Sequence, residues 1–243
     1  MLCFHFSYDS LHFLVWRESD KSLTLLAKDY EPTAIFASGV MSRGSAIAFI
    51  CHDERGNIKM LQYAPSDEAA RGGNRMVCRS DFYLGAQTVT INSHWCRSSL
   101  LCASANVTSS WAALQRQEGF RSYSDENKRF GVHFGTIDGG MGTIVPVSEQ
   151  VFWRMTALQS IMGNALECQC GLNFRMWRLF RRTSRRGACQ SMERRKGILD
   201  GSLLFRYSEL PLQEQEDFAS AIGSTVGLIM DNLLEIECAT LIL

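Results

Sequence analysis

The sequence lacks an excess of charge of either sign, because 25 lysine and arginine residues balance 25 aspartate and glutamate residues in a chain of 243. A balanced chain has no overall field that would attract nucleic acid or an anionic membrane, so any such signal has to be local. With 46% hydrophobic residues the chain is able to build a large core. We therefore expect a globular protein of one large or two ordinary domains.

Long apolar runs are also missing. The longest uncharged stretch, residues 98–115, is diluted with serine, asparagine and threonine, and the N-terminus MLCFHFSYDS has no basic region before an apolar core. A signal peptide needs both of those parts, and a membrane-spanning helix needs about 20 mostly apolar residues. We therefore expect a soluble, intracellular chain with no membrane partner.

The nine cysteines lack the paired spacing of a metal site, since no CxxC motif occurs. Cys168 and Cys170 form one close pair without a histidine beside it, and Cys96 with Cys102 forms the other. In a reducing compartment such cysteines are buried small hydrophobic residues rather than disulfides. We expect no metal and no cofactor.

Catalytic motifs are absent as well. The sequence has no G-x-S-x-G, no H-E-x-x-H, no Walker loop and no EF-hand loop. Its histidines lie in or beside expected strands, with no two at ligand spacing: His5, His12, His52, His94 and His133. Aspartates at strand ends make turns through their own side chains. We therefore expect a protein that is not an enzyme and has no small-molecule substrate.

One glycine-rich stretch raises the question of a phosphate loop. FGTIDGGMGTIVPV, residues 134–147, has four glycines within eight residues. Val145 stands where a third glycine of a dinucleotide loop would be, and no Gly-Lys-Ser/Thr ending follows. Asp138-Gly139 is instead a strong signal for a hairpin with a tight primed turn, because glycine adopts positive φ without steric cost. We expect Asp138, Gly139 and Gly140 to form a structural turn.

Residues 1–147 have the pattern of an all-β region. Short apolar runs such as LHFLVW, SLTLLA, AIAFICHD and GVHFGTI recur about every ten residues between polar turns, which indicates a sandwich, barrel or propeller. Residues 98–130 break this rhythm and are expected to form a long surface connection.

Residues 148–243 have a helical pattern instead. Apolar residues recur at helical spacing after Ser148, which is the expected N-cap of a first helix. Pro211 and Gly223 bracket a second helix, and a third begins near Val226 after Ser224 or Thr225. The sequence therefore predicts a mainly β fold plus α, with a domain boundary near residue 147.

The one local concentration of positive charge lies in residues 175–196, which contain nine of the 25 basic residues and a single acid, Glu193. The nine are Arg175, Arg178, Arg181, Arg182, Arg185, Arg186, Arg194, Arg195 and Lys196. One interpretation is a phosphate-contacting patch in which Trp177 and Phe180 stack on bases. The other is a solvated face, or one neutralised by packing near residues 197–243, which contain eight acidic residues and one basic residue, Arg206. The sequence leaves both interpretations open.

Several motifs together resemble a known family. SLTLLAKDYEP, RGGNRMVCRSDFYLGAQTVT, GTIDGGMGTIVPV, GLNFRMWRLF, GILDGSLLFRY and AIGSTVGLIMDNLLEIE are similar to the C-terminal region of the largest subunit of the cleavage and polyadenylation specificity factor. Proteins of the same build are the large subunit of the damaged-DNA-binding complex and a splicing factor 3b subunit. Phe174, Ser202 and the tail CATLIL depart from the usual family pattern.

The resemblance implies a chain of three seven-bladed β-propellers followed by a helical C-terminal domain. It also implies a nuclear, non-catalytic scaffold in pre-mRNA 3′-end formation. Its implied partners are a WD40-repeat subunit and a CCCH zinc-finger subunit, which read the AAUAAA signal, and RNA itself is a further candidate. Because a blade needs about 40 to 45 residues, residues 1–147 are expected to form about three C-terminal blades of an incomplete WD40-like β-propeller.

Overall fold

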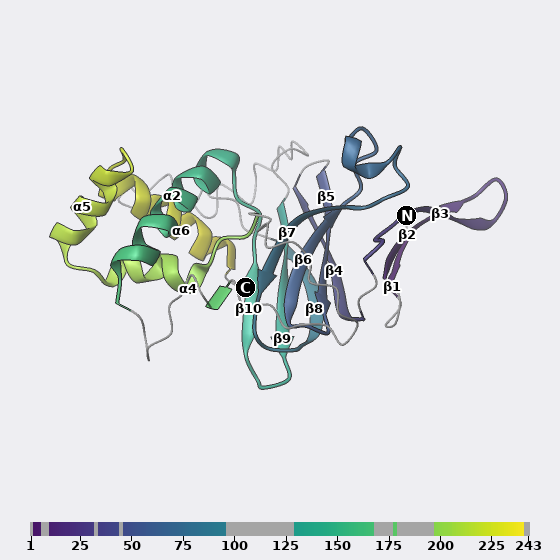
Figure 1. Cartoon of the computed structure of the whole chain (residues 1–243), viewed down its shortest axis with the longest axis horizontal. Helices are drawn as coiled ribbons and strands as arrows, with labels where there is room; N and C mark the ends of the chain where they lie inside the picture. The colour runs from purple at the N-terminus through teal and green to yellow at the C-terminus, as the bar shows by residue number, and fades with distance from the viewer. Residues whose placement is uncertain are drawn as a thin grey trace, which may run out of the picture.

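The computed structural model describes residues 2–5, 10–31, 34–43, 46–95, 129–167, 177–178 and 197–240. Antiparallel sheets occupy the centre and one end of the molecule, and a group of helices occupies the other end (Figure 1). The fold therefore mixes antiparallel sheets and helices, with the sheets first along the chain, as expected. The expected connection at 98–130 lies almost entirely outside the described residues.

The strands form two antiparallel sheets, one of three strands and one of seven, and along the chain the larger sheet divides into two groups of consecutively paired strands. The first sheet contains β1 (Leu2–His5), β2 (Leu11–Arg17) and β3 (Ser22–Lys28). The second group is β4 (Ile35–Arg43), β5 (Ala46–Asp53), β6 (Asn57–Gln62) and β7 (Val77–Tyr83). The third is β8 (Thr88–Trp95), β9 (Arg129–Thr136) and β10 (Met141–Ile144). Within each group, every strand pairs with the next one along the chain.

The first and second groups pack against each other through their faces. Phe13 of β2 meets Phe49 of β5 with ring centroids 5.0 Å apart. The shared core consists of Leu11, Phe13, Ala27, Ile35, Phe49, Cys51, Leu61 and Met76. Cys51 is only 1% exposed in this core, as expected for a cysteine that acts as a small hydrophobic residue.

The opposite face of the second group packs against the third. This core contains Met41, Ile50 and Ile58 of the second group together with Val132 of β9. The approach is close, because a Cβ atom added to Gly39 of β4 would lie 2.5 Å from the Ile91 side chain of β8. Since successive side chains of a strand point to opposite faces, β5 sends Phe49 to one neighbour and Ile50 to the other. The second group is thus the middle layer of a three-layer stack, and it also pairs with β9 through residues 42 and 43 of β4.

The helical part begins where the β region ends. It contains α2 (Glu149–Ala165), α4 (Gly201–Leu204), the 3-10 helix η4 (Phe205–Glu209), α5 (Leu212–Ala221) and α6 (Val226–Thr240). Its own core is centred on Met155, Leu158, Met162, Tyr207 and Ile229, each 0% exposed. The helical part therefore has a core separate from those of the sheets.

The ends of these helices agree with the sequence. Ser148 is the N-cap of α2, and its hydroxyl accepts a hydrogen bond from the Val151 N–H. Thr225 caps α6 by accepting from the Leu228 N–H at 3.3 Å. Gly223, with φ +66°, follows α5 in the left-handed region that glycine favours. Short elements were harder to predict, since β1, β7, α4 and the 3-10 helices η1 (Glu68–Ala70) and η4 have no clear sequence pattern.

Candidate functional site

Arg178 is the member of the predicted basic set that the structure describes, and it lies where the helical part meets the second sheet group. Its Nε donates to Asp200 Oδ2 at 2.6 Å, and its Nη1 donates to the backbone carbonyl of Tyr83 at 2.7 Å. The guanidinium also lies over the Phe82 ring, 4.4 Å from its centroid. With its side chain only 12% exposed, Arg178 is committed to contacts inside the chain rather than to a phosphate.

Asp200 is held by hydrogen bonds within the helical part as well as by Arg178. Its side chain accepts from the Ser202 N–H and caps α4, and its own N–H donates to Gln159 of α2 at 2.7 Å. The carboxylate that pairs with Arg178 is therefore oriented by contacts with α2 and α4 that do not involve the ion pair. A buried, hydrogen-bonded pair of this kind gives a definite orientation at a junction.

Trp177 extends the junction to the end of β7. Its indole ring meets the Tyr83 ring edge-on, with centroids 5.2 Å apart. A Cβ atom added to Gly85 would lie 2.5 Å from this indole, and Gly85 has φ +82°, so this position accepts only glycine. Trp177 is therefore engaged in packing, and its availability for base stacking is reduced.

Gly197, which follows the basic segment in the chain, contacts the same strand. A Cβ atom there would lie 2.5 Å from Ser80 Cβ and 3.1 Å from the Arg79 carbonyl oxygen. Both flanks of residues 179–196 thus contact β7. The other eight members of the basic set lie outside the described residues, and their role stays a prediction: Arg175, Arg181, Arg182, Arg185, Arg186, Arg194, Arg195 and Lys196.

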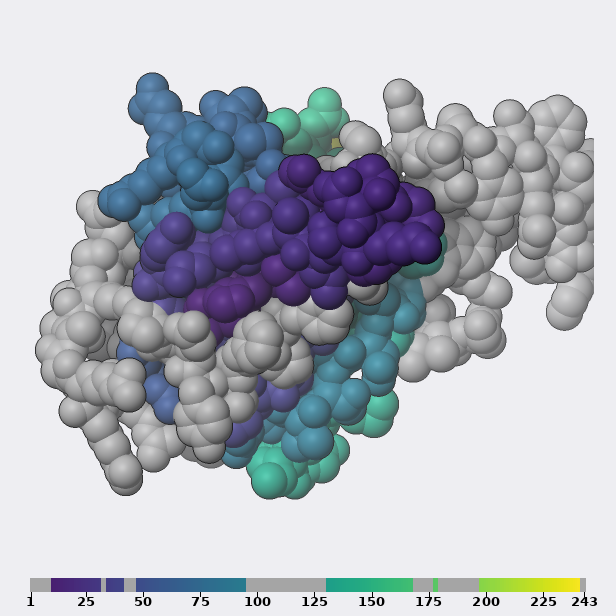
Figure 2. Space-filling model, turned by 90° about the vertical axis from the view of Figure 1, so that its right-hand side faces the viewer, coloured from purple at the N-terminus to yellow at the C-terminus, as the bar shows by residue number. Residues whose placement is uncertain are grey.

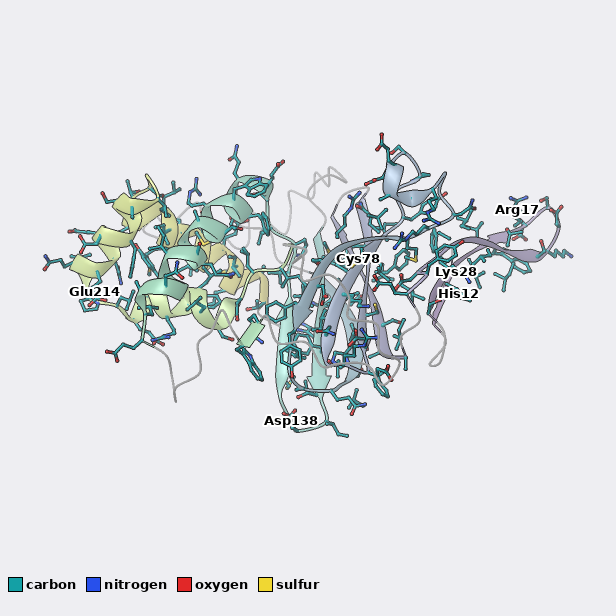
Figure 3. All side chains as sticks on the ribbon, in the orientation of Figure 1. His12, Arg17, Lys28, Cys78, Asp138 and Glu214 are labelled. Carbon is teal, nitrogen blue, oxygen red and sulfur yellow. The ribbon has the colours of Figure 1, made fainter. Side chains whose placement is uncertain are left out.

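The Asp138-Gly139 stretch forms the turn between β9 and β10, at the lower tip of the sheets in Figure 3. Thr136 N–H donates to the Gly140 carbonyl at 2.8 Å, and Gly139 N–H donates to the Thr136 carbonyl at 3.1 Å. Gly139 has φ +86°, whereas Asp138 is not left-handed. The loop therefore has three residues with one left-handed glycine. The hairpin is present as predicted, but the prediction of a primed turn is wrong. No helix follows it, so no phosphate loop is formed.

A buried ionic group that sequence reasoning missed lies between the first and second sheet groups. Lys59 Nζ is 3.1 Å from Glu31 Oε2 and 3.7 Å from Asp53 Oδ2, and the Lys59 side chain is 6% exposed. Burial lowers the pKa of Lys59, but the charges of Asp53, Glu31 and Asp29 raise it more, so its pKa is raised overall. The lysine stays charged, and the group fastens the sheets together rather than moving protons.

His52 forms hydrogen bonds to the backbone of the connection between β7 and β8. Its Nε2 donates to the Ala86 carbonyl at 3.0 Å, while Nδ1 accepts from the Thr88 N–H at 3.4 Å. That pair of contacts requires a neutral ring with its proton on Nε2. Burial lowers the pKa of His52, although the charge of Asp53 opposes this effect. The histidine is structural, as expected from its place in a strand.

Two further results concern ligands and membranes. Within the described ranges, no group of three or more histidine, cysteine or acidic residues could hold a metal ion. No helix in the same part of the chain is long and apolar enough to cross a membrane. The contacts that the structure does show are structural junctions between packed layers.

The fold defines a class of protein, namely a stack of antiparallel sheets joined by a fixed junction to a helical extension. Residues 7–209 match the model of the CPSF A subunit region, and the chain belongs to this family. The resemblance found in the sequence motifs is thereby confirmed.

Curated relatives match nearly the whole chain. It is 31% identical over 236 residues to cleavage and polyadenylation specificity factor subunit 1 of Arabidopsis thaliana, covering 96% of this chain and 14% of that protein. It is 29% identical over 230 residues to the subunit 1 protein of Drosophila melanogaster, covering 95% and 14%. Protein cft1 of Aspergillus niger is 28% identical over 214 residues, covering 87% and 14%. The chain thus spans 14% of the length of each of these relatives.

Proposed function

We propose that the chain is part of a non-catalytic scaffold subunit of the nuclear machinery that cleaves and polyadenylates pre-mRNA. The observation that carries this proposal is the junction at Arg178, which fixes a helical extension to a stack of sheets in a chain of the CPSF A subunit region family. The described side chains at this junction are occupied in holding the layers together. Rigid, multi-layer surfaces of this kind suit the binding of several other proteins at once.

We further propose that the three sheet groups in residues 1–147 are blades of a WD40-like β-propeller, and that residues 148–243 form a helical C-terminal domain. Face-to-face stacking of small antiparallel sheets is how propeller blades pack. The middle group buries both of its faces, while the first sheet leaves Trp16, Leu23 and Leu25 between 42% and 53% exposed. Those exposed side chains suit a further blade of a longer chain.

The expected partners follow from the same proposal. A WD40-repeat subunit and a CCCH zinc-finger subunit would bind the scaffold and read the polyadenylation signal, and the scaffold would support that recognition. Affinity purification of the tagged full-length protein from nuclear extract tests this, and polyadenylation-factor subunits are the expected result. Recovery of cullin-ligase or spliceosomal subunits would instead place the protein in a paralogous branch.

A second candidate function is a nucleic-acid-binding module that acts through residues 175–196. The observation that favours it is that the two described residues that bracket this segment in the chain, Arg178 and Gly197, both contact β7. Arg178 itself is removed from this set, because it is paired with Asp200.

Filter binding with RNA across a salt series separates the two functions, since phosphate-driven binding weakens steeply with salt. The test variant changes Arg181, Arg182, Arg185 and Arg186 to alanine. The control, Arg17→Glu with Lys28→Glu on the first sheet (Figure 3), lowers the net charge equally. Loss of RNA binding in the test variant alone supports the module, whereas unchanged affinity rules it out.

A further inference from the structure

Helices α5 and α6 carry six carboxylates and no basic side chain. On α6, Met230, Asp231, Leu234 and Glu237 lie on the side away from the core, and we call these four residues the α6 outer face. Met230 is 36% exposed and Leu234 is 44% exposed. Two apolar side chains spaced i and i+4, bordered by two carboxylates, make this a mixed apolar and acidic surface.

The inner side of α6 fixes the orientation of this face. Ile229, Leu233 and Ala239 are buried, and Asn232 accepts a hydrogen bond of 2.5 Å from Arg154 of α2. Because these contacts are made at helical spacing, the helix has no freedom to rotate and hide Met230 and Leu234. Their exposure is therefore built into the packing of the helical part.

The charge of α6 is unfavourable for an isolated helix. Glu237 lies near the C-terminal end, where the helix dipole is negative and a cation would be stabilising. The last turn contains no basic residue, and within the described part of the chain neither Asp231 nor Glu237 forms an ion pair. Positive groups supplied from outside would offset this repulsion, whereas the phosphates of a nucleic acid would add to it.

We propose that the α6 outer face binds a basic, amphipathic peptide segment of a partner protein. Apolar side chains of that segment contact Met230 and Leu234, and its lysine or arginine residues pair with Asp231 and Glu237. Amphipathic helices that pair with one another combine spaced apolar anchors and flanking charges in this way. The inference rests on the scaffold function proposed above, to which it adds one surface and one partner chemistry.

The test uses a fluorescent, helix-forming peptide of lysine and leucine. Its binding to the full chain is measured with the chain kept at nanomolar concentration. One test variant is Leu234→Ser, which removes the apolar anchor, and the other combines Asp231→Asn with Glu237→Gln. The matched control is Glu214→Gln with Glu216→Gln, which removes the same charge from α5, where Glu214 points outward (Figure 3). Circular dichroism verifies that each variant keeps its helix content.

We expect both test variants to bind the peptide about tenfold more weakly and the α5 control to bind as the unmodified chain does. Equal weakening by the α5 control would show non-specific attraction and overturn the proposal. Unchanged binding by Leu234→Ser would overturn it too. If alanine at Arg181, Arg182, Arg185 and Arg186 makes the peptide bind more tightly, the natural occupant is the chain's own basic segment, which also overturns the proposal. Affinity purification of the full-length protein tests the scaffold function separately.

Discussion

The Nε atom of Arg178 lies 2.6 Å from Oδ2 of Asp200, and the same guanidinium reaches the carbonyl of Tyr83. One side chain therefore connects the cap of α4 to the end of β7. Because Arg178 has a planar group with several fixed donors, separate nitrogens make the two contacts, whereas a lysine would present a single nitrogen to both acceptors.

Arg178→Ala should destabilise the chain by about 3 kcal/mol, because it leaves the buried Asp200 carboxylate without its partner. The matched control is Arg79→Ala, which breaks the more exposed pair with Asp67 and should cost much less. Thermal-shift midpoints measured for both variants provide the comparison. Equal decreases in the thermal midpoint would mean that the buried Arg178–Asp200 pair contributes no more to stability than an exposed pair does.

Gly139→Val should lower stability by about 1–3 kcal/mol through backbone strain, because φ at Gly139 is +86°. No atom lies within 4 Å of an added Cβ there, so crowding is not the cause. Gly139→Asn is the control, since asparagine enters the left-handed region more readily than valine. Comparable thermal midpoints for the two variants would contradict this account of the turn.

Stability should fall as the pH drops below about 6.5, partly through His52. Its pKa is lowered in the folded chain, so the unfolded chain binds the proton more readily. The contribution is therefore fully present above the unfolded pKa and is lost as the pH falls through the folded pKa. His52→Gln should be less stable than the unmodified chain at pH 7.5, and the gap should narrow toward pH 5 in urea titrations. A gap that stays constant would show that His52 does not titrate as proposed.

Residues 1–147 expressed alone should be prone to aggregation, and addition of residues 148–243 should help only partly. The reason is that the first sheet, which faces the viewer in purple in Figure 2, leaves the apolar side chains of Trp16, Leu23 and Leu25 exposed. Size-exclusion chromatography of both lengths, and of a longer chain with its upstream blades, measures the effect.

Leu23→Ser with Leu25→Ser should reduce the aggregation of residues 1–147. A monodisperse, cooperatively unfolding monomer from the unmodified segment would instead show a closed small β fold. The propeller proposal would then be withdrawn.

Local signals explain what was predictable. Ser148, Pro211 and Gly223 mark helix ends through contacts with their immediate neighbours, and most strands were expected where apolar runs alternate with turns. The family could also be recognised, because its motifs are continuous stretches of sequence.

The candidate site was less predictable. In the sequence Arg178 looks like the other arginines of the basic segment. Only its contacts with Asp200 and Tyr83 in the folded chain show that it is a buried structural residue. Lys59 likewise pairs with Glu31, which lies 28 positions away in the chain. A local sequence pattern cannot predict a contact over that separation.

The sequence by itself determined the order of the elements, their caps and the family, since these depend on residues close together in the chain. Only the tertiary structure decided which charges are paired inside and which face outward. Arg178 is paired with Asp200, 22 positions away in the chain, and Lys59 with Glu31, 28 positions away, while the orientation of α6 leaves Asp231 and Glu237 on its outer side. The physical reason is that burial and pairing depend on how layers pack, and packing joins residues that the chain keeps far apart.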